Sequence, residues 1–119
     1  MKYLLLIYES EGVGASLSEA EQGKIYQEYM DYTNRINKNG NYIAGEALQP
    51  IATATTVRVK NGKTVTTDGP FAETREQLGG FFMVEAKDLD EAVALAAGIP
   101  GARTGSIEVR PIMPTPPPA

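Results

Sequence analysis

The sequence predicts a single α+β domain in which two β-α-β units are joined by an inserted β-hairpin. A chain of 119 residues has room for one domain with a hydrophobic core. Two capping signals mark the starts of two helices. The pair Asn61-Gly62 lies between two β-branched runs, which is a strong signal for a hairpin with a type I′ turn.

An apolar run opens the chain. Residues 3–8 are apolar at both alternating positions, which predicts a strand buried on both of its faces. The run is too short to span a membrane and leads directly into Glu9. We therefore expect a strand rather than a signal peptide. Residues 9–14 are expected to form a loop because of their composition.

A helix is expected to follow this loop. Ser18 and Glu21 form a capping box, with Ser16 and Glu19 as an alternative start one turn earlier. Asn39-Gly40 provides the C-terminal stop. Residues with helical spacing predict the buried face: Ile25, Tyr29, Tyr32 and Ile36, widened by Tyr26 and Met30.

The second half of the chain completes the predicted order. Asp88 and Glu91 cap a short helix, and residues 68–78 read as an irregular polar loop. The order is that of a ferredoxin-like βαββαβ fold with an inserted hairpin. The domain is expected to cover residues 1–113, with 114–119 as a disordered, proline-rich tail. The remaining expected strands cover residues 42–45, 53–60, 64–67, 81–86 and 106–111.

The apolar pattern also predicts a homodimer. Two helices can cover only one face of such a sheet, whereas residues 3–8 and 81–84 are apolar on both faces. The second face therefore needs a cover. A second copy of the chain, packed sheet to sheet about a two-fold axis, is the simplest one.

Composition excludes several classes of function. The chain has no cysteine and no histidine, which removes disulfides, thiol and serine-histidine nucleophiles, and zinc sites built on these residues. No metal site and no cofactor are expected. The net charge of -4, with 11 scattered Lys and Arg residues, argues against binding to nucleic acid or to anionic membranes. A cytoplasmic location is the default expectation.

One segment carries a family resemblance. Residues 68–82, which begin Asp68-Gly69-Pro70-Phe71, resemble the signature of the DGPF branch of the YCII-related proteins. The resemblance implies a ferredoxin-like fold that dimerises into an α/β barrel. The wider group is thought to include small-molecule enzymes with a His-Asp pair, a mechanism that a chain without histidine cannot use. Supporting similarities lie at residues 1–8, 45–48, 53–59, 99–100 and 108–111.

Two carboxylates are candidates for acid/base catalysis. Asp68 is either a residue of a rigid Gly-Pro turn or a group held at the mouth of a pocket, with Phe71 as its apolar wall. Phe71 is otherwise expected to fill the core. Glu46, in an apolar stretch, is either a buried acid with a raised pKa or an exposed carboxylate of an edge strand.

The expected ligand-binding residues come from three segments. Glu73 and Arg75, followed by Glu76, alternate in sign and form either a solvated, self-paired loop or part of the site. Glu108 and Arg110 share one face of a strand, where they pair with each other or line the dimer cavity. Tyr3 and Tyr8 are five positions apart in one strand, so their side chains point to opposite faces of the sheet. At most one of them therefore faces this cavity. The residues expected to bind ligand are Phe71, Glu73, Arg75, Tyr8, Glu108 and Arg110.

These observations lead to two hypotheses for function. In the first, the protein binds a small molecule in the dimer cavity near residues 68–76. As an enzyme it would use carboxylate acid/base chemistry, for which elimination or isomerisation is suited. In the second, it is a non-catalytic regulatory or interaction module. DGPF proteins are often encoded beside extracytoplasmic-function sigma factors, so the resemblance implies a sigma factor as its partner.

Overall fold

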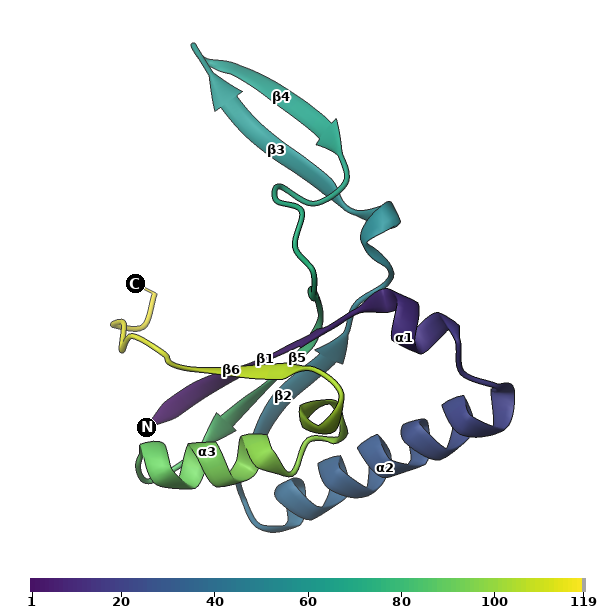
Figure 1. Ribbon diagram of the computed structural model, residues 1–119. Helices are drawn as coiled ribbons and strands as arrows, with labels where there is room; N and C mark the ends of the chain where they lie inside the picture. The colour runs from purple at the N-terminus through teal and green to yellow at the C-terminus, as the bar shows by residue number, and fades with distance from the viewer. Residues whose placement is uncertain (119) are drawn as a thin grey trace.

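The main sheet of the protein has four strands in the order β2-β5-β1-β6, and all neighbouring strands are antiparallel. The computed structural model describes residues 1–118 (Figure 1). A second, two-stranded sheet is formed by β3 and β4. The strands are β1 (Lys2–Glu9), β2 (Tyr42–Ala47), β3 (Thr55–Lys60), β4 (Lys63–Asp68), β5 (Gln77–Glu85) and β6 (Ser106–Pro111).

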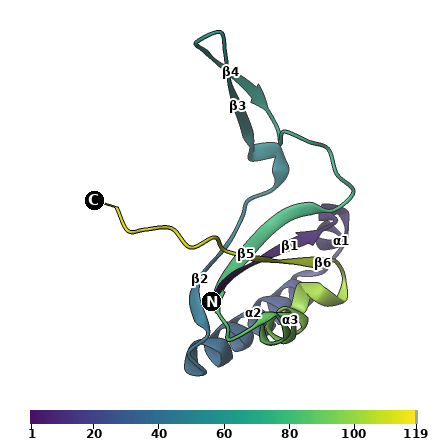
Figure 2. The same cartoon turned by 90° about the vertical axis from the view of Figure 1, so that its left-hand side faces the viewer.

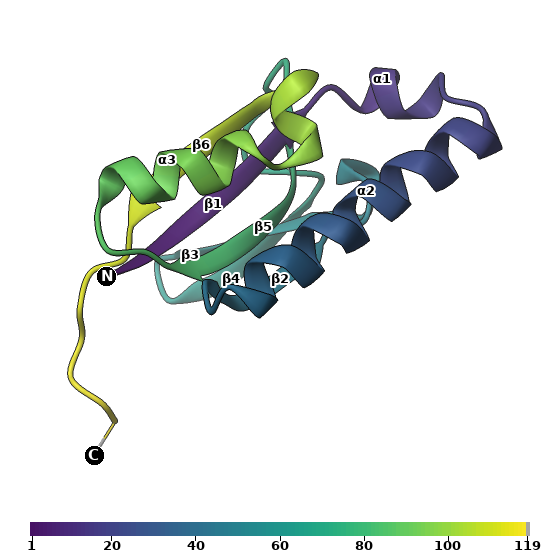
Figure 3. The same cartoon turned by 90° about the horizontal axis from the view of Figure 1, so that it is seen from below.

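Two helices, α2 and α3, cover one face of the main sheet (Figures 1 and 3). This mixed α+β arrangement is compatible with the ferredoxin-like fold that the sequence predicts. Among residues 1–118, no helix has both the length and the apolar character that a membrane span requires. The helices are α1 (Glu11–Ala15), α2 (Glu19–Lys38) and α3 (Leu89–Ala97), and the 3-10 turns are η1 (Ile51–Thr53) and η2 (Pro100–Arg103).

The capping box of α2 forms as predicted. The Ser18 hydroxyl accepts a hydrogen bond from the Glu21 N–H, at 3.1 Å, and a Glu21 carboxylate oxygen accepts one from the Ser18 N–H, at 3.0 Å. The hydrogen bond from the Ser18 backbone lowers the pKa of Glu21. The alternative start at Ser16 is wrong, because Ser16 ends the short helix α1.

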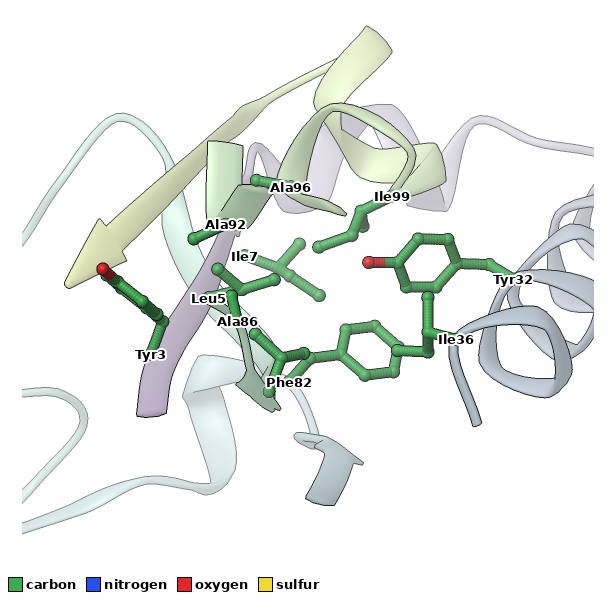
Figure 4. Packing of buried hydrophobic residues seen from close by; sticks show 11 residues of the cluster. Tyr3, Leu5, Ile7, Tyr32, Ile36, Phe82, Ala86, Ala92, Ala96 and Ile99 are labelled. Atoms are coloured by element: carbon green, nitrogen blue, oxygen red, sulfur yellow. The ribbon is translucent and has the colours of Figure 1, made fainter. Parts of the chain in front are cut away.

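The core lies between the sheet and the helices (Figure 4). The Tyr32 ring meets the Phe82 ring edge-on, with centroids 5.2 Å apart. Its hydroxyl donates a hydrogen bond of 2.6 Å to the Leu95 carbonyl oxygen of α3. Tyr32 of α2 therefore contacts both the sheet and α3. The buried cluster consists of Tyr3, Leu5, Ile7, Tyr32, Ile36, Phe82, Val84, Ala86, Ala92, Ala96 and Ile99.

The opposite side of the sheet has no helix on it, and we call it the open face. Leu4 lies beside Met83, and Leu6 beside Phe81, in adjacent positions of β1 and β5. All four side chains are only partly buried. They form an apolar centre on the open face, as the two-sided apolar pattern of these strands predicts.

Gly80 allows the edge strand β2 to approach β5 closely. A Cβ atom at Gly80 would lie 2.8 Å from the Glu46 carbonyl oxygen and 3.4 Å from the Ala47 Cα atom. Both neighbours are backbone atoms, which cannot move without breaking the strand pair. A glycine is therefore required at this position by the close contact between the backbones.

The hairpin β3–β4 extends away from the body of the molecule (Figure 2). Its Asn-Gly turn is confirmed, since Asn61 and Gly62 have φ values of 51° and 76°, as a type I′ turn requires. The radius of gyration is 16.5 Å, whereas a compact chain of this length has about 13.5 Å. The hairpin and the C-terminal segment, residues 112–118, both project from the body (Figure 2) and contribute to the extended shape.

Several sequence predictions need correction. Residues 11–15 form α1 rather than loop, and β5 begins at Gln77, before the predicted end of the polar loop. Tyr26 and Met30 are 67% and 41% exposed and do not belong to the core. Apart from these corrections, residues 112–118 form neither helix nor strand, and residue 119 of the predicted tail lies outside the described residues.

The first test concerns Tyr32 and alkaline pH. Burial raises the pKa of Tyr32 from 10 to about 12. Since the unfolded chain ionises first, the stabilisation from this hydroxyl is complete below pH 10 and is lost as the pH rises towards 12. We expect Tyr32→Phe to lower the free energy of unfolding by about 1 kcal/mol near neutral pH. Urea unfolding across the pH range measures this difference, which should shrink above pH 10.

Tyr26→Phe is the matched control, because the Tyr26 side chain is largely exposed. This variant should follow the wild type at every pH. A Tyr32→Phe deficit that stays constant up to pH 12 would contradict the assignment.

Candidate functional site

A pocket of about 930 Å³ lies on the helix side of the sheet, opposite to the open face. It is lined by α1, by the middle of α2 between Ile25 and Thr33, by η2, and by the adjoining ends of β1, β2 and β5. The buried residues of α2, Tyr32 and Ile36, both lie in its C-terminal half. The N-terminal end of α2 extends beyond the sheet (Figure 3).

The wall of the pocket is largely apolar. Tyr26 and Met30, which are too exposed to belong to the core, line it from α2. The spacing of Tyr26 and Met30 on the helix predicts that they face the core. They do face the same side as the core residues, but they border the pocket and are not packed against other side chains. Other apolar lining residues are Ile7, Leu17, Ile25, Leu48 and Phe82.

Polar groups gather at the end of the pocket that is formed by β1, α2 and η2. The Gly101 N–H donates a hydrogen bond of 3.1 Å to the Tyr29 hydroxyl oxygen. A Cβ atom at Gly101 would lie 2.5 Å from Glu9 Oε1 and 2.8 Å from the Tyr29 hydroxyl oxygen. The carboxylate and the phenol therefore converge on one glycine, and any side chain there would displace them. We call Glu9, Tyr29 and Gly101 the polar end of the pocket.

The electrostatics keep Tyr29 protonated. Burial, and then the negative charge of Glu9, raise the pKa of Tyr29 to about 12, although the Gly101 N–H and Arg103 act in the opposite direction. Since its oxygen already accepts from Gly101, the hydroxyl proton is the group that Tyr29 can offer to a ligand. The polar end thus combines a neutral donor with a negatively charged acceptor.

The remaining charges of the pocket are mostly negative. Arg103 is the one cation among the lining residues in the described part of the chain, and it pairs with Glu28 of α2 at 2.7 Å. This hydrogen bond lowers the pKa of Glu28 and raises that of Arg103. Glu9, Glu11 and Glu46 supply carboxylates to the lining. The pocket is therefore better suited to a positive or hydrogen-bond-donating group than to an anion.

The structure does not bring the sequence-predicted site residues together. Glu46 lines the pocket from the edge strand β2, with an exposed side chain, so its alternative as a buried acid is wrong. Tyr8, Glu108 and Arg110 lie on the open face, where Leu6 is paired with Glu108, and Tyr8 with Ser106. Glu108 and Arg110 form an ion pair with each other, as their shared parity predicts.

The residues around the DGPF segment form a third group. Asp68 is the last residue of β4, is paired with Thr55, and is exposed. Phe71 is 80% exposed and fills no core. Glu73 and Arg75 are also exposed. None of these four residues is among the described residues that line the pocket.

The neighbouring Glu76 has a structural contact. Its carboxylate accepts a hydrogen bond of 2.8 Å from the Ser106 hydroxyl at the start of β6. This contact ties the segment after the hairpin to the edge of the main sheet. Within residues 1–118, the carboxylates form no cluster of three or more that could hold a metal ion.

The polar end was not predicted from the sequence. The sequence predicts a loop at Glu9 and a core position for Tyr29, and it predicts no role for Gly101. The helical spacing that includes Tyr29 correctly indicates that this residue is partly buried. The role of its hydroxyl depends on η2, which places the Gly101 N–H within hydrogen-bond distance of the Tyr29 oxygen. No short motif contains the three residues, because 72 positions separate Tyr29 from Gly101.

The fold and the site define a small α+β domain with an open sheet face and an apolar pocket beneath one helix. The model of the YCII-related domain matches residues 1–116, and the chain belongs to this family. A protein of Rhizobium meliloti (strain 1021), itself described as uncharacterized, is 36% identical over 114 residues. The alignment covers 94% of this chain and 92% of that relative.

The second test concerns the coupling between Glu9 and Tyr29. Glu9→Gln removes the negative charge that helps to raise the pKa of Tyr29, so this pKa should fall below its wild-type value of about 12. Titration of the ring-labelled tyrosines by NMR measures it directly. Glu46→Gln, a change of the same type at an exposed residue of the pocket lining, should leave Tyr29 unchanged. Equal effects of the two substitutions would contradict the assignment.

Proposed function

We propose that the protein binds a small, largely apolar molecule in the pocket beneath α2. The observation that carries the proposal is the polar end, where Glu9 and the protonated Tyr29 converge at an otherwise apolar pocket. Such a combination of apolar walls and a few convergent polar groups is typical of small-molecule sites. The ligand would place its apolar body along α2 and its polar group at Glu9 and Tyr29.

The charges narrow the class of ligand. Arg103 is engaged by Glu28, whereas Glu9 and Glu11 leave the pocket with excess negative charge. We therefore expect a ligand with an amine or another hydrogen-bond donor for Glu9, together with an acceptor for the Tyr29 hydroxyl. A carboxylate ligand would be repelled.

The same pair suits acid/base chemistry. In an isomerisation, Glu9 would take a proton from one substrate carbon and return it to another, while the Tyr29 hydroxyl would stabilise the negative charge that develops on a substrate oxygen. In an elimination, the electron pair left by this proton would form the double bond, and a leaving group on the neighbouring carbon would depart with its own bonding pair. This assignment replaces the roles expected for Asp68 and Glu46, which lie apart from each other at the surface. Asp68 would then have a structural role in the hairpin, where it is the last residue of β4 and is paired with Thr55.

The protein is also proposed to act as a homodimer. Leu4, Leu6, Phe81 and Met83 form a continuous apolar centre on the open face, and the α2 and α3 layer covers only the other side. Two sheets pack through such apolar faces at about 10 Å, with interdigitated side chains. The cavity expected from the sequence would lie at the edge of this packed centre, where the two sheets diverge. Tyr8, Glu108 and Arg110 would then line the dimer cavity or its rim.

The uncovered face and hairpin also favour a second function, that of a regulatory or interaction module. In this case the apolar face would bind a different protein, for which a sigma factor is the candidate that the family resemblance suggests. The pocket would then serve as a regulatory site or have no role. The oligomeric state and ligand binding distinguish the two functions.

The third test measures ligand binding. We expect an aromatic amine to bind more tightly than the alcohol of the same shape, and the corresponding carboxylate to bind least, in titrations followed by NMR. Glu9→Gln and Tyr29→Phe should each weaken binding of the amine about tenfold, as expected for loss of one hydrogen bond. The chemical-shift changes caused by the amine should map to residues that line the pocket on the α2 side of the sheet.

Asp68→Asn distinguishes this site from one on the DGPF segment. The variant should bind the amine as the wild type does, since Asp68 does not line the pocket. Loss of binding in Asp68→Asn, with Glu9→Gln unaffected, would overturn the proposal and restore the segment at residues 68–76 as the site.

The fourth test measures the oligomeric state. Sedimentation of the wild type should show a dimer at micromolar concentration. Leu6→Gln should weaken this dimer, because it places an amide in the apolar centre of the open face. Val93→Gln is the control, since Val93 is half-exposed on α3, in the other layer. A wild type that stays monomeric would overturn the proposed dimer.

A further inference from the structure

The hairpin lacks the packing that would make it stable by itself. All residues of β3 and β4 are exposed except Thr56, which is partly buried. Val59 is 70% exposed and Val57 58%. A two-stranded hairpin without a covered face is marginally stable in water. Its strands therefore require a packing partner.

The hairpin has two different faces. Val57 and Val59 lie opposite Thr66 and Thr64, so that one face is uncharged and β-branched along most of its length. The other face contains Arg58 opposite Val65, and Lys60 opposite Lys63. This division predicts that the face with Val57 and Val59 is the one that becomes buried, while the basic face meets solvent.

The position of the hairpin relates it to the open face. It lies on the side of the main sheet opposite to α2 and α3 (Figures 1 and 2). Seen from the helix side, it falls behind the region of β2 and β5 (Figure 3). Any molecule packed on the open face would therefore lie next to the hairpin.

We infer that the hairpin, residues 55–68, is an arm that packs on a second copy of this chain bound to the open face. The inference rests on the proposed dimer. In a two-fold arrangement each chain provides one open face and one arm, so both uncovered surfaces of both chains are covered at once. The face with Val57 and Val59 is the surface of the arm that contacts the partner.

The arm would enlarge the interface that the open face provides. Four strands about 4.8 Å apart, with about 6 residues each at about 3.3 Å per residue, give a footprint of about 400 Å². A stable interface buries about 800 Å² on each partner. The arm would add apolar contact area on each partner beyond this flat footprint of the sheet.

The arm can be removed without opening the chain. The Gly69 N–H donates a hydrogen bond of 2.7 Å to the Ala54 carbonyl oxygen, so the two ends of the arm meet at its base. Replacing residues 55–68 by Asn-Gly would close this base with a short turn. We expect the resulting protein to keep the wild-type fold by circular dichroism and to be monomeric at micromolar concentration.

Substitutions on the two faces of the arm provide the matched test. Val57→Lys with Val59→Lys should raise the dissociation constant of the dimer about a hundredfold, because two buried apolar side chains become charged. Val65→Lys with Thr67→Lys places the same two charges on the basic face and should change the constant less than about threefold. Sedimentation equilibrium measures all three constants.

The outcomes separate the inference from the dimer that it assumes. A monomeric wild type overturns both. A dimer that survives removal of the arm, or that responds equally to substitutions on both faces, overturns the arm contact and leaves the sheet-to-sheet dimer in place. A wild type that is monomeric alone but binds a different protein through Val57 and Val59 also overturns the inference.

Discussion

The antiparallel register of β1 and β5 is the constraint on which the rest of the structure depends. It places Leu5 beside Phe82 on the helix side and Leu6 beside Phe81 on the open face. Because side chains alternate between faces, a shift by one residue would exchange the two sets. The core under Tyr32, the wall of the pocket and the apolar centre of the open face all follow from this one pairing.

Much of the fold could be predicted because its signals are local. The capping box at Ser18 and the turn at Asn61-Gly62 form as expected, and residues 3–8 lie in β1. The strand is fully buried only on its helix side, because its other face is the open face. The errors arise where tertiary packing overrides composition. Helix α1 contains two glycines and was assigned to a loop, but its Glu11 carboxylate accepts a hydrogen bond from the Ile51 N–H, at 2.7 Å.

The candidate site was predictable only in part, because it depends on contacts that no short pattern encodes. Glu9, Tyr29 and Gly101 meet through the way η2 folds back onto α2, and the ion pair of Arg103 with Glu28 holds these two elements together. Glu108 and Arg110, whose relation is set by strand parity, were placed correctly. Phe71 was expected to be covered, but the turn after β4 leaves it at the surface.

The distribution of charge in the arm has a consequence for how two chains meet. With Arg58, Lys60 and Lys63 against Asp68, residues 55–68 carry +2, while the rest of the chain carries -6 within the net -4. A basic extension and an acidic body attract each other between two copies, over a range of about 10 Å at moderate ionic strength. This long-range attraction would orient the chains during their encounter and make the rate of association sensitive to salt, before any apolar surface comes into contact.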